Sequence, residues 1–548
     1  MGIIIADMPD ASLFHDVTRK TVAMLTRDGV RLDADLYRPA GAGPWPVLLM
    51  RQPYGRSIAS TIVYAHPSWY ARAGYLVVIQ DVRGRGTSEG VFRLMESERL
   101  DGEDSVAWAA ALPGSSGVVG MYGFSYQGMT QFMAAANRPP ALRCLAPAMS
   151  AWDVRAHFAT EGDAFRLQAG LGWGCQLALE TVRRAGDAAA HQAILAAARA
   201  QPLGAETPCL PGIAESLGRH GHYLDWLTEP EGAPYWGGVS PSAHAAGIGL
   251  PALHVGGWYD PLLAGTLAGY RAMRGRAPQM LVVGPWVHIP WDRHVGARDF
   301  GPDASSRIDL LQLRWFDHWL KGIDTGLLTE PPVRLFELAG TWREYPAFPE
   351  PPATPWHTAS QGRAGMDPAD GTLSPAQSGA GEDVIVFDPW RPTPSMGGHA
   401  GHPAGPLDRA AVDARSDVLT FTTPALEADL RLAGDIALDA AIACDQPSFD
   451  ISAILSEVMP DGRVFEIASG HRRVNTPVSP VRVDLRAVCA RVPAGHRLRL
   501  SIAAGSFPLF PVNSGTGLPP ARERLIDQRI ITLVLNHAGT VLHLPVDG

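Results

Sequence analysis

Short hydrophobic runs recur along the first part of the chain, and stretches of helical character lie between several of them. Examples are VLLM (47–50), YLVVIQDV (75–82), GVVGMYG (117–123), ALHVGGWYD (252–260) and QMLVVGP (279–285). Near-continuous apolar runs of this length are typical of parallel strands that are covered on both faces of a sheet. The alternation of such runs with helical stretches such as 97–112 predicts a doubly wound α/β sheet.

The alternation is interrupted at about residue 150, where the pattern becomes helical. Residues 151–240 contain Ala-rich sequence, such as LALETVRRAGDAAAHQAILAAARA (177–200), and several aromatic residues. The simplest interpretation is a helical insertion over the carboxyl ends of the strands, where the ligand sites of α/β sheets lie. A stabilising appendage with no role in the site is the alternative.

A second change follows the amphipathic stretch LLQLRWFDHWLKG (310–322). Residues 346–382 are rich in Pro, Gly, Ser and Ala, which indicates an irregular linker. Polar and apolar residues alternate beyond it, most strictly in RLRLSI (497–502), which predicts an all-β sandwich or jelly roll. The predicted domains are an α/β domain (1–150 and 241–345), a helical cap (151–240), and a linker with a C-terminal jelly roll (346–548).

Composition and charge narrow the classes of function. The 548 residues are 46% hydrophobic and 18% charged, which suits several packed domains. A net charge of −9 and the lack of a Lys/Arg block argue against nucleic acid as a partner. We expect no signal peptide and no membrane span, and the five scattered cysteines form no metal-binding or disulfide pattern. The expectation is a cytoplasmic protein without metal or cofactor.

The stretch GFSYQG carries the first candidate chemistry. Ser125 stands between Gly123 and Gly128, after a predicted strand and before a predicted helix. Serine hydrolases place their nucleophile at such a turn, usually written G-x-S-x-G, but here the second glycine comes one residue later. We expect both glycines to allow close packing of strand and helix, and Gln127 to point outward. The helix start would also offer unpaired N–H groups to an oxyanion.

A serine nucleophile needs a base, and the base needs an orienting acid. GGWYDP places Asp260 at the end of one apolar run, and GPWVH places His288 just past the next. The separation, 288 − 260 = 28 residues, leaves room for one crossover helix. Alone, Asp260 fits a helix N-cap and His288 fits an ordinary surface histidine. Together, in the chain order that α/β hydrolases use, they predict a triad with Ser125.

An oxyanion hole completes this chemistry. One expected donor is the backbone N–H of Tyr126, the residue after the nucleophile. Lipase-type enzymes take the second from a Gly-rich loop, but this chain has RQPYGR in that place. The hydroxyl of Tyr54 is the natural substitute, and a packed loop tyrosine is the alternative.

Several motifs together resemble a known family. RQPYGR, DVRGRGTSEG, GFSYQG, GGWYDP and VGPWVH look, in order and spacing, like the cocaine-esterase-like acyl esterases of the X-Pro dipeptidyl-peptidase group, and motifs in the cap and C-terminal segments fit too. The resemblance implies an α/β-hydrolase core with an inserted helical cap and a C-terminal jelly roll. It implies Ser125 as nucleophile, Asp260 as acid and His288 as base, with the Tyr54 hydroxyl and the Tyr126 amide as oxyanion donors. Relatives commonly carry G-x-S-Y-x-G, and they suggest a homodimer.

The resemblance leaves the substrate open. A branch that acts on α-amino acid esters and β-lactams implies carboxylates just after the catalytic acid, whereas Pro261, Leu262 and Leu263 stand there. An apolar acyl pocket is the more natural use of the two leucines. Trp173 is added as a third substrate-binding residue, because LGLGW-like sequence recurs in the cap of the family.

Three functions are therefore weighed. The first is a serine esterase or acylase that acts on a small-molecule ester. The second is an X-Pro dipeptidyl aminopeptidase with the same triad, in which Glu161, Asp163 and Asp153 of the cap would hold a free amino terminus. The third is a carbohydrate-binding jelly roll with a decayed hydrolase core, which the intact triad argues against. We expect the first, with amide or β-lactam acylase activity as a further alternative.

Overall fold

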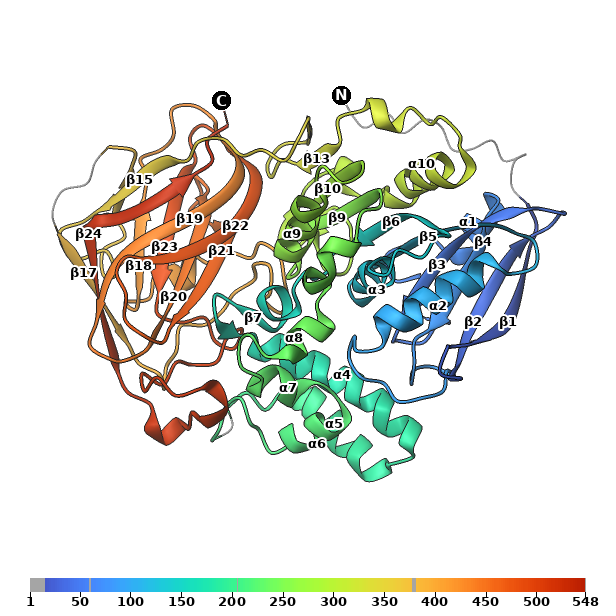
Figure 1. Cartoon of the computed structure of the whole chain (residues 1–548). Coiled ribbons are helices and arrows are strands. Elements are labelled where there is room, and N and C mark those ends of the chain that lie inside the picture. The colour runs from blue at the N-terminus through green and yellow to red at the C-terminus, as the bar shows by residue number, and fades with distance from the viewer. Residues whose placement is uncertain (1–14, 59–60, 205, 377–380, 548) are drawn as a thin grey trace.

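Three parts make up the molecule, as the computed structural model shows in Figure 1. The structure describes residues 15–58, 61–204, 206–376 and 381–547. A sheet flanked by helices adjoins a group of helices, α4 to α8 (residues 167–239), and a β-rich part formed by the C-terminal segment lies beside both (Figure 1). None of the helices within these ranges is long and apolar enough to cross a membrane.

The α/β part is built on a ten-stranded sheet with the order β1-β2-β4-β3-β5-β6-β9-β10-β13-β14. Neighbouring strands from β4 to β13 run parallel, and the pairs at the two edges are antiparallel. The strands are β1 (Val17–Leu25), β2 (Arg31–Pro39), β3 (Trp45–Gln52), β4 (Leu76–Asp81), β5 (Ser115–Phe124), β6 (Leu142–Ala148), β9 (Ala252–Tyr259), β10 (Gln279–Val287), β13 (Val333–Phe336) and β14 (Trp342–Tyr345).

Helices cover both faces of this sheet. They are α1 (Pro67–Arg72), α2 (Glu98–Ala110), α3 (Tyr126–Ala135), α9 (Leu263–Met273) and α10 (Ile308–Lys321). Along β3, Leu48 and Met50 enter the core with α1 and α10, whereas Val47 and Leu49 enter the core with α2 and α3. A strand buried on both sides needs apolar residues at every position. The α/β sheet predicted from the short hydrophobic runs is confirmed.

The inserted helical cap is also present. Its elements are a π-helical turn (Arg155–Ala159), the hairpin β7 (Thr160–Glu161) and β8 (Ala164–Phe165), and the helices α4 (Leu167–Ala185), α5 (Ala188–Ala200), α6 (Ala214–His220), α7 (Tyr223–Thr228) and α8 (Pro234–Val239). The cap has its own core, which also contains Tyr126 and Met129 of α3. We keep 151–240 as the proposed limits of this cap.

The C-terminal part is an all-β sheet with the order β21-β20-β23-β18-β16-β15-β24-β19-β22, and β17 pairs with β24. Its strands are β15 (Thr354–Ala359), β16 (Thr372–Ser374), β17 (Glu382–Phe387), β18 (Val418–Thr422), β19 (Leu430–Cys444), β20 (Phe449–Val458), β21 (Val464–Val474), β22 (Val481–Val492), β23 (Arg497–Ala503) and β24 (Ile531–Leu544). The expected linker 346–382 thus contains two strands, which its Pro and Gly content concealed. Other short elements are α11 (Ala410–Asp413), β11 (His294–Val295), β12 (Arg298–Asp299) and several 3-10 turns, among them Pro241–Gly247.

Candidate active site

Ser125 lies in the turn between β5 and α3, as the sequence predicts. Its φ of +60° is costly for a residue with a side chain, and such a strained strand-to-helix turn is the nucleophile elbow of α/β hydrolases. The Ser125 N–H donates to the carbonyl of Ala148 at 2.9 Å, and the Ser125 carbonyl accepts from the N–H of Gly128 at 2.9 Å. These bonds tie the turn to β6 and to the first turn of α3.

Close packing explains why the second glycine of the motif stands at position 128. A Cβ on Gly128 would lie 2.6 Å from the Cβ of Ser150 and 3.0 Å from the carbonyl oxygen of Ala148. A Cβ on Gly123 would lie 2.5 Å from the Cβ of Gln127. Gln127 does not point outward as expected: it is fully buried, and its Oε1 accepts from the N–H of Phe124 at 3.2 Å. The outward prediction was wrong because Gln127 fills the space that Gly123 leaves beneath the turn.

Asp260 and His288 follow the neighbouring strands β9 and β10. The Nδ1 atom of His288 lies 2.7 Å from Oδ1 of Asp260. Asp260 is completely buried, whereas 28% of the His288 side chain is exposed. The His288 ring is 5.5 Å from the ring of Phe124, the residue before Ser125. Because the strands are parallel, Ser125, Asp260 and His288 all lie at the side of the sheet where the carboxyl ends of β5, β9 and β10 meet.

Tyr54 lies just after β3, in the loop that replaces a Gly-rich segment. Its backbone N–H donates to Oε1 of Gln52 at 2.7 Å, which fixes the loop. Trp173 of the cap donates its indole N–H to the Tyr54 hydroxyl at 3.2 Å. Burial raises the pKa of Tyr54 to about 12, while hydrogen bonds with Trp173 and Ser125 act in the opposite direction. The hydroxyl therefore remains protonated at neutral pH and lies next to the serine.

A buried ion pair supports Tyr126, the first residue of α3. The Tyr126 hydroxyl donates to Oε1 of Glu98 at 2.8 Å, and Oε2 of Glu98 is 2.6 Å from Nη1 of Arg51. All three side chains are buried. They fix the helix residue whose amide is the predicted oxyanion donor. Sequence reasoning missed Glu98 and Arg51, although Arg51 begins the RQPYGR motif.

The three residues expected to bind substrate do not share one environment. Trp173 and Leu262 belong to the core between cap and α3, and Trp173 stacks on Phe158 with ring centroids 4.6 Å apart. Leu263 instead packs in the core that extends into the C-terminal sheet. Trp173 is thus joined to Tyr54, and Leu262 lies in the same cluster, whereas Leu263 faces away from it. A role for these three residues in substrate binding stays a prediction.

The cap carboxylates that the peptidase alternative assigns to a free amino terminus already have partners. Glu161 lies 2.7 Å from Arg166, 2.9 Å from His399 and 3.7 Å from Arg486. Burial alone would raise its pKa, but these three neighbours hold it well below its usual range. The other two cap carboxylates are also engaged. Asp163 forms an ion pair with Arg472 at 3.0 Å, and Asp153 accepts a hydrogen bond from the Ser242 hydroxyl at 2.9 Å.

Comparisons with known proteins identify the family. Residues 28–290 match the family model described as X-Pro dipeptidyl-peptidase (S15 family), and residues 325–539 match the X-Pro dipeptidyl-peptidase C-terminal non-catalytic domain. The chain is 32% identical to cocaine esterase of Rhodococcus sp. (strain MB1 Bresler), over 91% of this chain and 92% of that one. The chain belongs to this family. The resemblance predicted from the motifs is confirmed, and the chain is a hydrolase of the esterase class.

Solved structures with the same fold cover all three parts. An aminopeptidase from a marine sediment archaeon, Thaumarchaeota archaeon, superposes with a TM-score of 0.79 at 23% identity, covering 99% of this chain and 98% of that one. An α-amino acid ester hydrolase superposes with a TM-score of 0.78 at 22% identity, covering 100% and 99%. At these identities the likeness concerns the fold alone.

In this member of the X-Pro dipeptidyl-peptidase family, the C-terminal sheet reaches the loop of the predicted acid. Arg486 of β22 donates from Nη1 to the carbonyl of Asp260 at 2.8 Å and from Nη2 to the carbonyl of Pro261 at 2.9 Å. Arg166 of the cap donates to the same Pro261 carbonyl at 2.9 Å. The turn that carries Asp260 is therefore held by all three parts of the molecule. No sequence signal marks Arg486, because it lies more than 220 residues from the turn.

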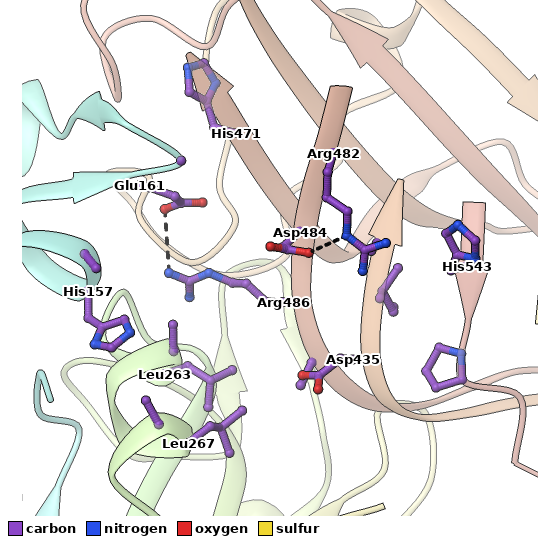
Figure 2. Close-up of a pocket in the computed structure, with 18 of the residues that line it drawn as sticks. His157, Glu161, Leu263, Leu267, Asp435, His471, Arg482, Asp484, Arg486 and His543 are labelled. Carbon is purple, nitrogen blue, oxygen red and sulfur yellow. Dashed lines mark hydrogen bonds and ion pairs between the residues drawn. The ribbon is translucent and has the colours of Figure 1, made fainter. Parts of the chain in front are cut away.

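A cavity of about 710 Å³ lies at this junction. Figure 2 shows Arg486 extending from its strand toward Glu161, with Leu263 and Leu267 of α9 below them. Most charged groups around it are paired, for example Arg482 with Asp484 at 3.2 Å. The lining of the cavity therefore carries little net charge. The cavity also borders one side of Arg486.

Proposed function

We propose that this chain hydrolyses carboxylic esters of small molecules through a Ser125–His288–Asp260 triad and an acyl-enzyme intermediate. One observation carries the proposal. Ser125 occupies the strained turn and is hydrogen-bonded to the Tyr54 hydroxyl. His288, which is paired with Asp260, packs against Phe124, the residue before Ser125. The esterase relative supports the ester as the substrate class.

The proposed chemistry follows from the atoms that are engaged. Nδ1 of His288 is bonded to Asp260, so Nε2 is the nitrogen that takes the proton of Ser125. The serine oxygen attacks the acyl carbon, and the carbonyl π electrons move to oxygen. His288 then returns the proton to the departing alcohol as the C–O bond breaks, which leaves Ser125 acylated. Water repeats these steps, releases the carboxylic acid and restores the serine.

The oxyanion formed in each attack needs donors that are already in place. We propose the Tyr54 hydroxyl and the Tyr126 amide for this role. The raised pKa of Tyr54, near 12, keeps its hydroxyl a donor at neutral pH. The buried Glu98–Arg51 pair holds Tyr126 so that α3 starts in a fixed place. Two rigid donors cost little reorganisation during the reaction.

The ion pairs of the cap favour an ester over an X-Pro peptide. A free amino terminus needs an available carboxylate, but Glu161 is shared by Arg166 and His399, and the other two candidates are engaged. Releasing Glu161 would leave buried cations without a partner, which is costly. Ester hydrolysis makes no such demand on these groups.

Replacing the nucleophile is the direct test. We expect Ser125→Ala to lower kcat for short acyl esters by about 10⁴-fold or more, because the members of a triad act as a unit. The variant should also stop reacting with a fluorophosphonate probe. Ser116→Ala is the matched control, since Ser116 is exposed on the same strand and should have no effect.

Two outcomes would overturn the proposal. Near-normal activity of the Ser125→Ala variant would reject the assignment of the nucleophile. Faster cleavage of an X-Pro anilide than of any short acyl ester by the unmodified chain would favour the peptidase function instead.

A further inference from the structure

The motif DVRGRGTSEG, which the proposed chemistry does not use, begins at the end of a strand beside the loop of Tyr54. Its first residue, Asp81, ends β4 and pairs in register with Gln52, the last residue of the parallel strand β3. Both side chains are buried, with exposed fractions of at most 1%. The two residues therefore lie together at the carboxyl edge of the sheet, where the loop of Tyr54 starts.

A chain of hydrogen bonds connects Asp81 to Tyr54. Nε2 of Gln52 donates to Oδ1 of Asp81 at 3.1 Å. Oε1 of the same side chain accepts from the backbone N–H of Tyr54 at 2.7 Å. Gln52 thus uses its donor group and its acceptor group at the same time, and its amide cannot rotate without losing one of the two bonds. The backbone of Tyr54 is fixed to Asp81 through this amide.

Asp81 also holds the far end of the Tyr54 loop. Its Oδ1 accepts from the backbone N–H of Arg56 at 2.7 Å, and its Oδ2 forms an ion pair with Nη1 of Arg56. Gly55 has a φ of +98°, a conformation that favours glycine, and it lets the chain turn between Tyr54 and Arg56. Tyr54 lies midway between Gln52 and Arg56, so one carboxylate fixes the loop on both sides of the tyrosine.

The rest of the motif keeps Asp81 in place. Gly86 has a φ of +53°, and a Cβ there would lie 1.9 Å from Oδ2 of Asp81. The hydroxyl of Ser88 donates to the carbonyl of Asp81 at 2.7 Å. Arg184 of the cap helix α4 donates to the carbonyls of Gly86 and Ser88. Glycine at position 86 therefore leaves room for the carboxylate, and the cap holds the segment that surrounds it.

These bonds complement the contact that the cap makes with Tyr54. Trp173 donates its indole N–H to the Tyr54 hydroxyl at 3.2 Å, at the outer end of the side chain. Gln52 holds the same residue at its backbone N–H. The phenol is thus held at both ends, which an oxyanion donor requires because a displacement of about 1 Å can cost about 10²-fold in rate.

We propose that Gln52 and Asp81 are positioning residues for the hydroxyl of Tyr54, so that RQPYGR and DVRGRGTSEG form one unit that places this oxyanion donor. The inference rests on the proposed function, in which the Tyr54 hydroxyl binds the oxyanion. Both residues act through the backbone of the Tyr54 loop rather than by touching the substrate. Their loss should therefore lower kcat and leave KM nearly unchanged, because the oxyanion forms only after the substrate has bound.

A double-mutant cycle with Tyr54→Phe tests the inference. We expect Gln52→Leu to lower kcat for short acyl esters by about 10- to 100-fold. In the Tyr54→Phe background the same change should cost about threefold or less, because the hydroxyl that Gln52 positions is already absent. Titration of Ser125 to completion with a fluorophosphonate gives the concentration of folded enzyme in each variant, so a loss of folded protein does not enter kcat.

Conservative and severe changes at Asp81 give a second measurement. Asp81→Asn keeps an oxygen that can accept from Gln52 and from the N–H of Arg56, whereas Asp81→Ala keeps none. We expect Asp81→Asn to retain most of kcat and Asp81→Ala to lose as much as Gln52→Leu. Both should leave KM nearly unchanged.

Gln279→Leu is the matched control. Gln279 also bonds on two sides: its Oε1 lies 2.9 Å from Nε2 of His254, and its Nε2 donates to a backbone carbonyl at 3.0 Å. It begins β10, at the opposite edge of the sheet from Ser125. Its replacement should lower the melting temperature and leave kcat unchanged, with or without the Tyr54 hydroxyl.

The cycle separates failure of the inference from failure of the proposed function. Equal losses of kcat from Gln52→Leu in both backgrounds, or no loss in either, would overturn the inference alone. An unaltered kcat in Tyr54→Phe would refute the assignment of Tyr54 as oxyanion donor, and the inference with it. Failure of the unmodified chain to hydrolyse any short acyl ester would refute the esterase proposal itself.

Discussion

Single residues around Ser125 are held by contacts from distant parts of the chain. The φ of +60° at Ser125 costs about 1–3 kcal/mol and persists because the surrounding bonds fix the turn. Tyr54 brings a hydroxyl from the loop after β3, and Trp173 of the cap orients it. The hydroxyl matters only if it remains protonated and stays in place while negative charge develops on the substrate.

Tyr54→Phe isolates the contribution of that hydroxyl. We expect kcat for short acyl esters to fall by about 10²–10³-fold with a small change in KM, as for the loss of one oxyanion donor. Because the pKa of Tyr54 is raised to about 12, its proton is lost only well above neutral pH. Activity of the unmodified chain should therefore show no decline assignable to Tyr54 below about pH 10. Steady-state kinetics across this pH range measure both effects.

The control for this variant is Tyr75→Phe. Tyr75 is another buried tyrosine, and its hydroxyl donates to Asp317 at 2.6 Å on the face covered by α10. Its removal should affect stability but leave kcat nearly unchanged. A Tyr54→Phe variant with unaltered kcat would show that the second oxyanion donor is a different group.

At the scale of elements, the sequence predicted what periodicity reveals and missed what packing decides. Hydrophobic runs located β3, β5, β9 and β10, and with them the ends where Tyr54, Ser125, Asp260 and His288 lie. The hairpin β7–β8 has two residues in each strand, too few to show a period. The strands β15 and β16 lie in a Pro- and Gly-rich segment whose composition indicates irregular structure.

The contact of α3 with β6 gives a prediction at this scale. In Gly128→Ala the new Cβ would press on Ser150 and on the carbonyl of Ala148, the group that accepts the Ser125 N–H. Overpacking of this kind costs about 1–3 kcal/mol, and here it would also shift the turn of the nucleophile. We expect a lower melting temperature and a kcat about tenfold lower. Calorimetry and ester kinetics on the same sample measure both.

Gly238→Ala serves as the comparison, because a Cβ at Gly238 in α8 would meet no atom within 4 Å. It should change neither property appreciably. If Gly128→Ala keeps full activity, the displaced glycine is not needed for the geometry of the elbow.

At the scale of the whole molecule, the C-terminal sheet contacts the loop of Asp260 through Arg486, and it also accepts a hydrogen bond from the hydroxyl of Tyr259, the residue before Asp260. Arg486 has a φ of +71°, and it lies where the pairing of β19 with β22 shifts register between Asp435 and Ala437. This irregularity accompanies a side chain that leaves the sheet and reaches the carbonyls of Asp260 and Pro261. The sequence predicted three parts but not this contact, since neither composition nor spacing links β22 to a turn so far away.

Arg486 is therefore expected to act as a positioning residue for Asp260. In Arg486→Gln the Asp260 carbonyl loses its arginine donor and the Pro261 carbonyl keeps only Arg166. Asp260 is then less well aligned with His288, and kcat should fall about 10- to 100-fold while KM changes little. The rate of reaction with a fluorophosphonate should fall in parallel. Arg486→Lys should recover part of the loss. Guanidinium ions should also restore part of kcat in Arg486→Ala, because the adjoining cavity of about 710 Å³ lets them reach the site.

Arg298→Gln separates this effect from a general weakening of the interface. Arg298 also joins the α/β part to the C-terminal sheet, with Nη1 2.9 Å from Glu457, but it has no bond to the Asp260 turn. Its loss should lower thermal stability without the drop in phosphonylation rate. If both arginine variants lower stability equally and leave kcat unchanged, the C-terminal sheet supports the fold alone. A selective loss of kcat in the Arg486 variants means instead that the acid of the triad depends on a residue from another part of the molecule.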